Sequence, residues 1–385
     1  MLTRRALLSS VAAAGLGSVL AACTRGSSPA PSASGSATRP SGPGLQAGRS
    51  REQLLAADSF SMVNFPDGHV TYQPVDGGYR VWLSSGVDGS GGSTVALDSP
   101  DLVEFTPAQL ADGKAVIGLA PVGGQVAFDS DYCAPGSVFP SADGSRLWLV
   151  YHSENHTFAG VTNVGSPFYA TIGLASSTDG GLTWDRQGAV ITGQVPRDDG
   201  PAPRDVVGAG SPSAVVVDDL VYVVYLDWNL AGPDQLHLAR APLASVDDPT
   251  AWVKWHEGSF STPGSGGDST AVVTRPGDGD ETVFAGGASL SWNTELQRYL
   301  LVFQSADGFW WTHSADLTGW AESQRFLPND APALDGARFV AYGSLLTPGE
   351  DTDQVTGRES YLYLATTGED EDSHSLWRIP VTVTA

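Results

Sequence analysis

The chain has little positive charge. Its 385 residues include 20 Lys and Arg against 43 Asp and Glu, a formal net charge of −23 at pH 7. Residues 1–50 contain five arginines and no acid, which leaves 15 basic against 43 acidic groups, or −28, for the rest. A surface this acidic repels phosphate backbones, so we do not expect nucleic-acid binding. The acidic loops are interpreted mainly as a solubilising surface.

A sustained helical period is also missing. The composition includes 46 Gly, 25 Pro, 11 Trp and 11 Tyr, which suits a turn-rich protein built from strands. From residue 51 onward, short runs of β-branched and aromatic residues alternate with Gly, Pro, Asp and Asn. We therefore expect an all-β fold.

The clearest local signal is the turn Ser-Thr-Asp-Gly-Gly-Leu-Thr-Trp at residues 177–184, which lies between two apolar runs. We expect Ser177 and Asp179 to bond to local amides, and Gly180 and Gly181 to adopt positive φ. Trp184 restarts the following strand. Two weaker copies, with the pattern S-x-D-L-x-x-aromatic, occur at residues 99–105 and 314–320. A hairpin device that recurs along a chain indicates repeated supersecondary units.

Five apolar runs also recur about 70 residues apart, which is a little longer than a four-stranded repeat requires. They occupy residues 79–83, 147–151, 221–225, 299–303 and 361–364. Most follow a turn signal, and each of the last four follows a run rich in small residues. These preceding runs, at residues 133–140, 211–217, 284–292 and 339–346, are predicted to be inner strands near a crowded axis.

The turn at residues 177–184 resembles the Asp-box of sialidases and related β-propellers. The two weaker copies resemble turns in the five-bladed propellers of family-43-type glycoside hydrolases. The resemblance covers most of residues 60–385 and implies a five-bladed β-propeller of four-stranded antiparallel blades. In such a fold the ligand site usually lies at one mouth of the central channel.

The N-terminus has the features of an export signal. Arg4 and Arg5 precede an apolar run, in a pattern that resembles a twin-arginine signal. Residues 20–23, Leu-Ala-Ala-Cys, resemble a bacterial lipobox, in which Cys23 becomes lipidated; an ordinary cleaved signal is the alternative. We expect a signal over 1–22, a flexible tether over 23–50 and the propeller over 51–385. With Cys23 lipidated, Cys133 is left without an intrachain disulfide partner.

Family-43-like enzymes use three acidic residues from different blades as general base, general acid and orienting carboxylate. The resemblance suggests Asp131, Glu154 and Asp227 for these roles. Asp131 precedes an Ala-Pro step at the start of an inner strand. Glu154 and Asp227 each end a second strand.

Four further residues are predicted to bind substrate. His152 and His156 flank Glu154, and Trp228 follows Asp227 as a stacking surface for a sugar ring. Asp205 precedes an inner strand and could supply another carboxylate.

The sequence also departs from the family pattern. Residues 207–212 contain no acid where the family usually has a Glu. Two functions therefore remain open: a glycoside hydrolase-like enzyme acting on neutral glycans, and a non-catalytic propeller that binds carbohydrate or protein. Arg378-Ile379-Pro380 resembles a sialidase motif but ends the chain, so it is interpreted as an ordinary strand.

Signals for metals and cofactors are weak. The acidic runs 278–281 and 369–372 lack EF-hand spacing and are interpreted as solvated turns, with Ca²⁺ as a minor alternative. We expect no cofactor, and a monomer whose partner is a glycan. The only expected membrane contact is the lipid on Cys23, at the outer face of the bacterial cell membrane.

Overall fold

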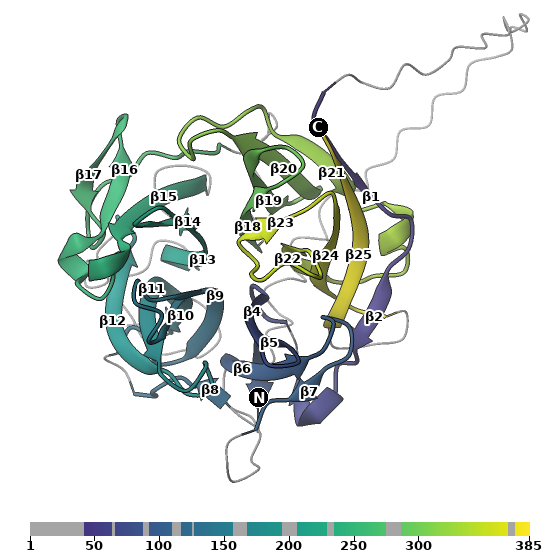
Figure 1. The fold of residues 1–385 in the computed structure, drawn as a ribbon, viewed down its shortest axis with the longest axis horizontal. Helices are drawn as coiled ribbons and strands as arrows, with labels where there is room; N and C mark the ends of the chain where they lie inside the picture. Colours follow the sequence, from purple (N-terminus) through teal and green to yellow (C-terminus); the bar gives the residue numbers. More distant parts are fainter. Residues whose placement is uncertain are drawn as a thin grey trace, which may run out of the picture. The chain divides into compact units, whose positions relative to one another are not determined.

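The computed structural model describes residues 42–63, 66–87, 92–109, 117–124, 127–156, 168–194, 206–228, 235–274, 286–368 and 374–385. The chain divides into two units, Met1–Pro43 and Gly44–Ala385, and every described strand belongs to the second (Figure 1). The predicted export signal, Cys23 and most of the tether lie outside the described residues. No helix in the described part of the chain has the length and apolarity needed to cross a bilayer.

The described part is all-β, as predicted, with short 3-10 turns in place of α-helices. The turns are η1 (Ser59–Ser61), η2 (Leu243–Ser245), η3 (Pro249–Ala251) and η4 (Pro332–Leu334). The strands form five antiparallel groups, called groups I to V in chain order.

Group I contains β3 (Met62–Val63), β4 (Thr71–Val75), β5 (Gly78–Val87), β6 (Gly92–Ser99), β7 (Thr106–Pro107) and β8 (Ile117–Leu119). Group II contains β9 (Tyr132–Pro140), β10 (Leu147–Asn155), β11 (Phe168–Ser177) and β12 (Asp185–Thr192). Group III contains β13 (Val206–Val217), β14 (Leu220–Trp228), β15 (Gln235–Pro242), β16 (Val253–His256) and β17 (Ser259–Pro263).

Group IV contains β18 (Gly286–Asn293), β19 (Arg298–Ser305), β20 (Gly308–Ser314) and β21 (Gln324–Pro328). Group V contains β22 (Val340–Leu346), β24 (Glu359–Thr366) and β25 (Ser375–Thr384), together with β1 (Gly44–Ala47) and β2 (Glu52–Leu55). The short β23 (Val355–Thr356) pairs with β18. All five predicted second strands lie in β5, β10, β14, β19 and β24. The four predicted inner strands overlap β9, β13, β18 and β22, and group I has its inner strand at β4.

The sheets are larger than the predicted four strands. The hydrogen-bonded sheets contain five, nine, five and six strands. Groups II and III merge into the nine-stranded sheet because β11 and β13 pair in parallel, with Phe168 beside Val206. Short edge strands such as β3 and β8 enlarge the sheet of group I. The hydrogen-bonded sheets therefore differ from the uniform four-stranded sheets that were predicted.

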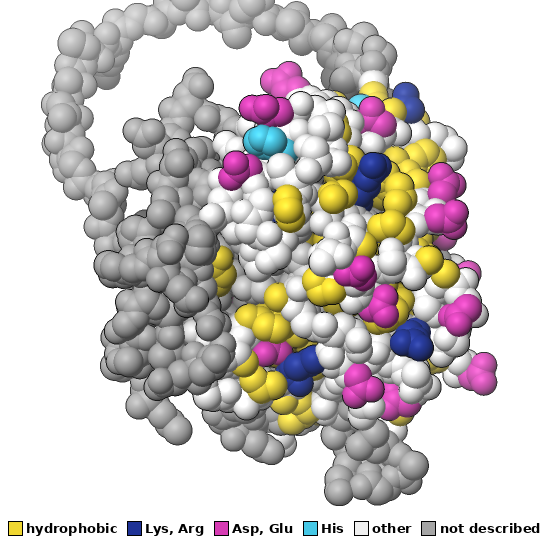
Figure 2. Space-filling view, turned by 90° about the vertical axis from the view of Figure 1, so that its left-hand side faces the viewer, with side chains coloured by type: hydrophobic (Ala, Val, Ile, Leu, Met, Phe, Trp, Pro, Cys, Tyr) yellow, Lys and Arg dark blue, Asp and Glu magenta, His cyan; other side chains and the backbone are white. Residues whose placement is uncertain are grey.

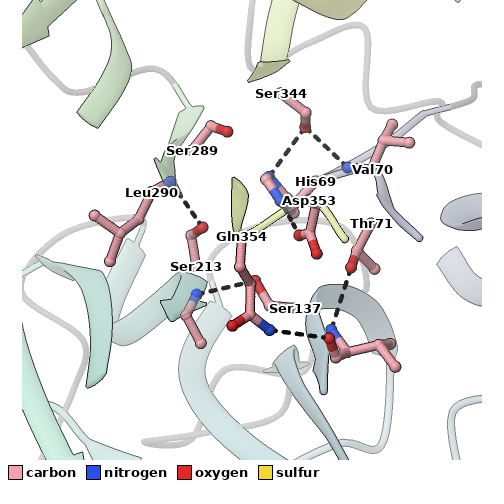
Figure 3. A network of polar contacts seen from close by, with 12 residues as sticks. His69, Val70, Thr71, Ser137, Ser213, Ser289, Leu290, Ser344, Asp353 and Gln354 are labelled. Atoms are coloured by element: carbon pink, nitrogen blue, oxygen red, sulfur yellow. Dashed lines mark hydrogen bonds and ion pairs between the residues drawn. The ribbon is translucent and has the colours of Figure 1, made fainter. Parts of the chain in front are cut away.

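The five groups are linked in a closed ring by one repeated hydrogen bond. In each case a hydroxyl on one inner strand accepts a backbone N–H from the next inner strand, or from Val70 directly before β4; Figure 3 draws these bonds except the one from Leu345. The five bonds are Val70 N to Ser344 Oγ (2.9 Å), Val138 N to Thr71 Oγ1 (3.2 Å), Ala214 N to Ser137 Oγ (2.9 Å), Leu290 N to Ser213 Oγ (3.0 Å) and Leu345 N to Ser289 Oγ (3.0 Å). The inner strands therefore follow the order I, II, III, IV, V around a common axis and return to I.

The hydrophobic core is divided in the same way. The described residues form five buried apolar clusters between consecutive groups, and the cluster between groups III and IV also includes Ala170 of group II. Between groups I and II, for example, Trp82 and Ala96 pack with Leu149, Ala175 and Trp184. Because both faces of each group are covered, the central strands are apolar on both sides rather than alternating. The side of the molecule drawn in Figure 2 carries scattered acidic side chains with fewer Lys or Arg among them.

The folded unit begins earlier than predicted. β1 starts at Gly44, within the segment interpreted as tether, and pairs with β25 from Gly44↔Thr384 to Ala47↔Val381. Leu45 and Ala47 pack on the cluster between groups IV and V. Residues 44–50 carry no local strand signal. β1 forms because it pairs with β25, which lies at the other end of the chain. β1 and β2 thus complete group V from the N-terminal side.

The turn between β11 and β12 forms as predicted. Ser177 Oγ accepts from Gly181 N (2.8 Å), and Asp179 Oδ1 accepts from Leu182 N and Thr183 N (both 3.0 Å). Gly180 and Gly181 have φ of 74° and 78°. The turns after β6 and β20 repeat the pattern, with Leu102 N and Leu317 N donating to Ser99 and Ser314 Oγ (2.8 and 3.0 Å).

Candidate functional site

One end of the axis is filled by the chain itself. Residues 347–358, called the hub loop, connect β22 to β24 and reach the inner strands of other groups (Figure 3). Gln354 Nε2 donates to Val138 O (3.3 Å), and Gln354 Oε1 accepts from Val216 N (2.9 Å). Trp292 N donates to Gln354 O (2.8 Å). These partners lie near the C-terminal ends of β9, β13 and β18, so the hub loop occupies that end of the inner strands.

Glu154 lies at the opposite end, on β10. The register of β9 and β10 places it across from Tyr132. Its two carboxylate oxygens contact two imidazoles: His152 Nε2 lies 3.2 Å from Oε1, and His156 Nε2 lies 2.5 Å from Oε2. All three side chains are buried. His152 and Glu154 point to the same face because they are two residues apart on an extended strand.

Asp131 joins this cluster through the backbone and through His156. Its N–H donates to Glu154 O (3.1 Å), and its Oδ2 accepts from His156 N (2.9 Å). Ser130 Oγ also donates to Asp131 Oδ2 (2.6 Å), and Asn155 Nδ2 donates to Ser130 Oγ (3.0 Å). The structure thus brings the side chains of Glu154, His152 and His156 into contact and links Asp131 to Glu154 and His156 through their backbones.

Aromatic rings wall the cluster. The ring centroids of Tyr132, Trp228 and Phe168 lie 5.6, 6.1 and 6.3 Å from that of His152. Phe168 also stacks on His156 at 5.6 Å. Trp228 reaches this cluster of group II from β14 of group III. The predicted stacking residue Trp228 thus lies beside His152, which contacts the predicted carboxylate Glu154.

Asp227 is turned away from the cluster. It precedes Trp228 on β14, and consecutive residues of a strand face opposite sides. Ser269 Oγ donates to Asp227 Oδ2 (3.4 Å), and the carboxylate acts electrostatically on Tyr225 and Lys254. Burial lowers the pKa of Lys254 to about 8, although Asp227 and Asp268 oppose the shift. The sequence placed Asp227 and Trp228 in one site, but the pleat separates them.

The remaining predicted positions are Asp205, the two acidic runs and Arg378. Asp205 and the acidic runs 278–281 and 369–372 lie outside the described residues. Arg378 lies on β25, where its Nη2 is 2.7 Å from Glu52 Oε2 and its guanidinium covers the Tyr361 ring at 4.3 Å. Arg378 therefore joins β25 to β2, as expected for an ordinary strand residue. Within the described ranges, no three His, Cys, Asp or Glu side chains are arranged to hold a metal ion.

An ion pair between Asp129 and Arg186 anchors the turn that carries Asp131. Asp129, which is 2% exposed, accepts from Arg186 Nε (2.6 Å) and from the Tyr151 hydroxyl (3.0 Å). Cys133 lies beside this pair, and burial raises the pKa of its thiol to about 12. The thiol is therefore protonated at neutral pH and unsuited to nucleophilic chemistry.

Sequence reasoning did not select Tyr132, Phe168 or Ser211. Tyr132 and Phe168 begin β9 and β11, and Ser211 N donates to His152 Nδ1 (3.3 Å). Only Tyr132 had a local signal, its position next to Asp131. Phe168 and Ser211 meet the cluster through pairings across the sheet, which the local sequence does not contain.

Comparisons with known proteins show the fold. No protein-family profile matches the chain, and no curated protein matches it in sequence. Solved structures do match. The catalytic domain of a family-62 α-L-arabinofuranosidase from Coprinopsis cinerea is 15% identical with a TM-score of 0.50, covering 88% of this chain and 97% of that one. A family-117 glycoside hydrolase from Zobellia galactanivorans is 10% identical with a TM-score of 0.51, covering 89% and 90%.

An α-L-arabinofuranosidase from Lactobacillus brevis is 12% identical with a TM-score of 0.51, covering 80% of this chain and 88% of that one. The chain thus shares the fold of propeller-type glycoside hydrolases. At these identities the likeness concerns the fold alone.

Proposed function

We propose that residues 44–385 form a five-bladed β-propeller, with groups I to V as its blades, that acts on neutral glycans as a surface-anchored glycoside hydrolase-like protein. The observation that carries the proposal is the cluster of Glu154, Asp131, His152 and His156, walled by Trp228 and Phe168. Carboxylates beside aromatic rings suit a sugar, because its hydroxyls bond to the oxygens and its CH faces pack on the rings.

In this proposal Glu154 and Asp131 are the carboxyl groups that work on a glycosidic bond. They come from one edge of group II, where Asp131 N donates to Glu154 O and the Asp131 carboxylate accepts from His156 N. Glycoside hydrolysis requires two such groups in different protonation states. Asp131 and Phe168 are half-buried, so they form the outer part of the proposed site. The shared fold with α-L-arabinofuranosidases supports a glycan as the substrate class.

A non-catalytic glycan-binding propeller is the second candidate. Two observations favour it: Asp227 faces away from Glu154, and residues 206–212 of β13 contain no carboxyl group. A binding site needs the aromatic walls and one anion but not a second carboxyl group that exchanges protons.

One experiment separates the two candidates. Release of sugar would be measured on a panel of aryl glycosides, including an α-L-arabinofuranoside, with wild type, Glu154→Gln and Asp131→Asn. Hydrolysis predicts turnover by wild type and a loss of at least about 100-fold in both variants. Asp227→Asn is the matched control and should retain most of the turnover. No turnover, together with binding to a glycan array that Trp228→Ala abolishes, supports the binding function. If neither turnover nor glycan binding occurs, the proposal fails.

We also propose that the chain is exported and anchored at the outer face of the membrane by lipid on Cys23. The lipobox-like residues 20–23 support this placement. Mass spectrometry of the purified protein from membranes should show a diacylglyceryl Cys23 at the mature N-terminus, and Cys23→Ala should release the protein into the medium. An unmodified Cys23 in the mature chain contradicts the proposal.

A further inference from the structure

The inner strand of group III departs from regular β geometry next to the candidate site. Gly210 pairs with Leu226 and Ser213 with Val224, but the register shifts between them. Ser211 has a φ of 50°. The same register shift recurs in the inner strands β9, β18 and β22, and Tyr342 of β22 has a φ of 59°, so this backbone shape belongs to the repeated inner strand. In group III it places the Ser211 backbone beside His152.

The consequence of this backbone shape is a hydrogen bond to His152. Ser211 N donates to His152 Nδ1 at 3.3 Å, from group III to group II. A ring nitrogen that accepts a hydrogen bond carries a lone pair, so the proton of the neutral ring is on Nε2. Nε2 is the atom that lies 3.2 Å from Glu154 Oε1. The backbone of Ser211 and the carboxylate of Glu154 therefore require the same tautomer.

Packing holds the imidazole in this orientation. Tyr132, Phe168 and Trp228 meet the ring at interplanar angles of 67°, 76° and 62°. On the remaining side lies Gly210, where an added Cβ would come within 2.3 Å of Nδ1 and 2.7 Å of the Trp228 ring. These contacts favour the orientation in which Nδ1 faces the backbone of group III.

We propose that His152 is a positioning residue: the backbone N–H of Ser211 locks it as the neutral Nε2–H tautomer, so that it donates permanently to Glu154 and keeps that carboxylate ionised. A permanent donor favours the charged form of a carboxyl group. The imidazoles of His152 and His156 contact the Glu154 carboxylate, the Cys133 thiol on β9 is coupled to it electrostatically, and the Asp131 carboxylate accepts from the backbone N–H of His156. The role that follows for Glu154 rests on the proposed function. An ionised Glu154 acts as a base or an anionic anchor and not as the general acid.

The tautomer can be measured without any sugar, so its test is independent of the proposed function. Long-range ¹H–¹⁵N correlations on the full chain with ¹⁵N-labelled histidine, at pH 8, should show the Nε2–H pattern for His152, with the signal assigned by its loss in His152→Gln. Ser211→Ala keeps the N–H and should leave the pattern unchanged. An Nδ1–H pattern or a doubly protonated ring overturns the proposal.

The effect on Glu154 is measured by ¹³C NMR of labelled glutamate carboxyl groups, with Glu154→Gln for assignment. His152→Leu removes the donor and should raise the pH at which Glu154 takes up a proton by about one unit. His152→Gln retains an amide donor, and its shift should be less than half as large. An unchanged midpoint in a folded His152→Leu protein contradicts the positioning role. If His152→Leu does not fold, the tautomer of the wild-type ring and the protonation midpoint of Glu154 in His152→Gln test the positioning role instead.

Discussion

The hydroxyl of Ser344 accepts the backbone N–H of Val70 at 2.9 Å, although the two residues are 274 positions apart. This bond joins group V to group I and closes the ring of five equivalent bonds between inner strands. Each bond has a hydroxyl as acceptor and a buried N–H as donor. The ring is therefore held at the axis by polar contacts and between the groups by apolar clusters.

The bond between groups III and IV can be tested at Ser213. Ser213→Ala leaves Leu290 N–H buried without this acceptor, and we expect a loss of about 1–3 kcal/mol in the free energy of unfolding. Urea denaturation at pH 7 measures the change. Ser213→Thr keeps the hydroxyl, as Thr71 does in group I, and should cost less than the alanine variant. Equal losses in both variants would show that the hydroxyl is not the cause.

Gly180 and Gly181 form a matched pair in the turn between β11 and β12. Both have positive φ, but an added Cβ at Gly181 would come within 2.2 Å of the Trp82 ring, whereas at Gly180 it meets only Arg80 Nη1 at 3.3 Å. We expect Gly180→Ala to cost about 1 kcal/mol from backbone strain. Gly181→Ala should cost about 1–3 kcal/mol more because of the clash. Thermal unfolding measures both, and a Gly181→Ala protein as stable as Gly180→Ala would contradict the packing argument.

His237 makes stability depend on pH. It is buried on β15, and burial, with Lys254 as a second cause, lowers the pKa of its ring to about 3. An unfolded histidine has a pKa near 6.5, so between about 3 and 6.5 only the unfolded chain binds the proton. The contribution is complete above pH 6.5 and is lost as the pH falls below it. From pH 7 to pH 5 we expect His237 to remove about 2 kcal/mol from the free energy of unfolding.

The contribution of His237 is isolated by comparison. Urea denaturation at pH 7, 6 and 5 should show a smaller loss in His237→Leu than in wild type. His256→Leu, at a more exposed position on β16, is the control and should keep the wild-type loss. Identical pH dependence in wild type and His237→Leu would mean that His237 is accessible to protons in the folded state.

The start of the folded unit is tested by truncation. A chain that begins at Gly42 retains β1 and should unfold at the wild-type temperature. A chain that begins at Arg51 lacks β1 and with it the packing of Leu45 and Ala47 on the cluster between groups IV and V. We expect that loss to cost about 1–3 kcal/mol, or several degrees in Tm. Equal melting temperatures for the two chains would show that residues 44–50 belong to the tether.

The candidate site was predictable where its residues share one strand. His152 and Glu154 are two apart on β10, so period-2 alternation places them on one face, and His156 follows at the strand end. Asp227 and Trp228 also share one strand but are adjacent, and the same alternation sends them to opposite faces. Because they are neighbours in sequence, both side chains were predicted to lie in one site, but the pleat of β14 points them to opposite faces of the sheet. Phe168 and Ser211 were not predictable, because they reach His152 and His156 from other strands.

Local physical chemistry, and therefore the sequence by itself, determined the turns, the strand positions and the acidic surface. The bonds from Ser177 and Asp179 to neighbouring amides span at most four residues, and alternation needs only adjacent residues. The tertiary structure alone decided that Gly44 starts a strand, that Ser344 meets Val70, and that Ser211 sets the tautomer of His152. Each of these contacts joins residues far apart in the chain, so it depends on how the ring closes and on no local pattern.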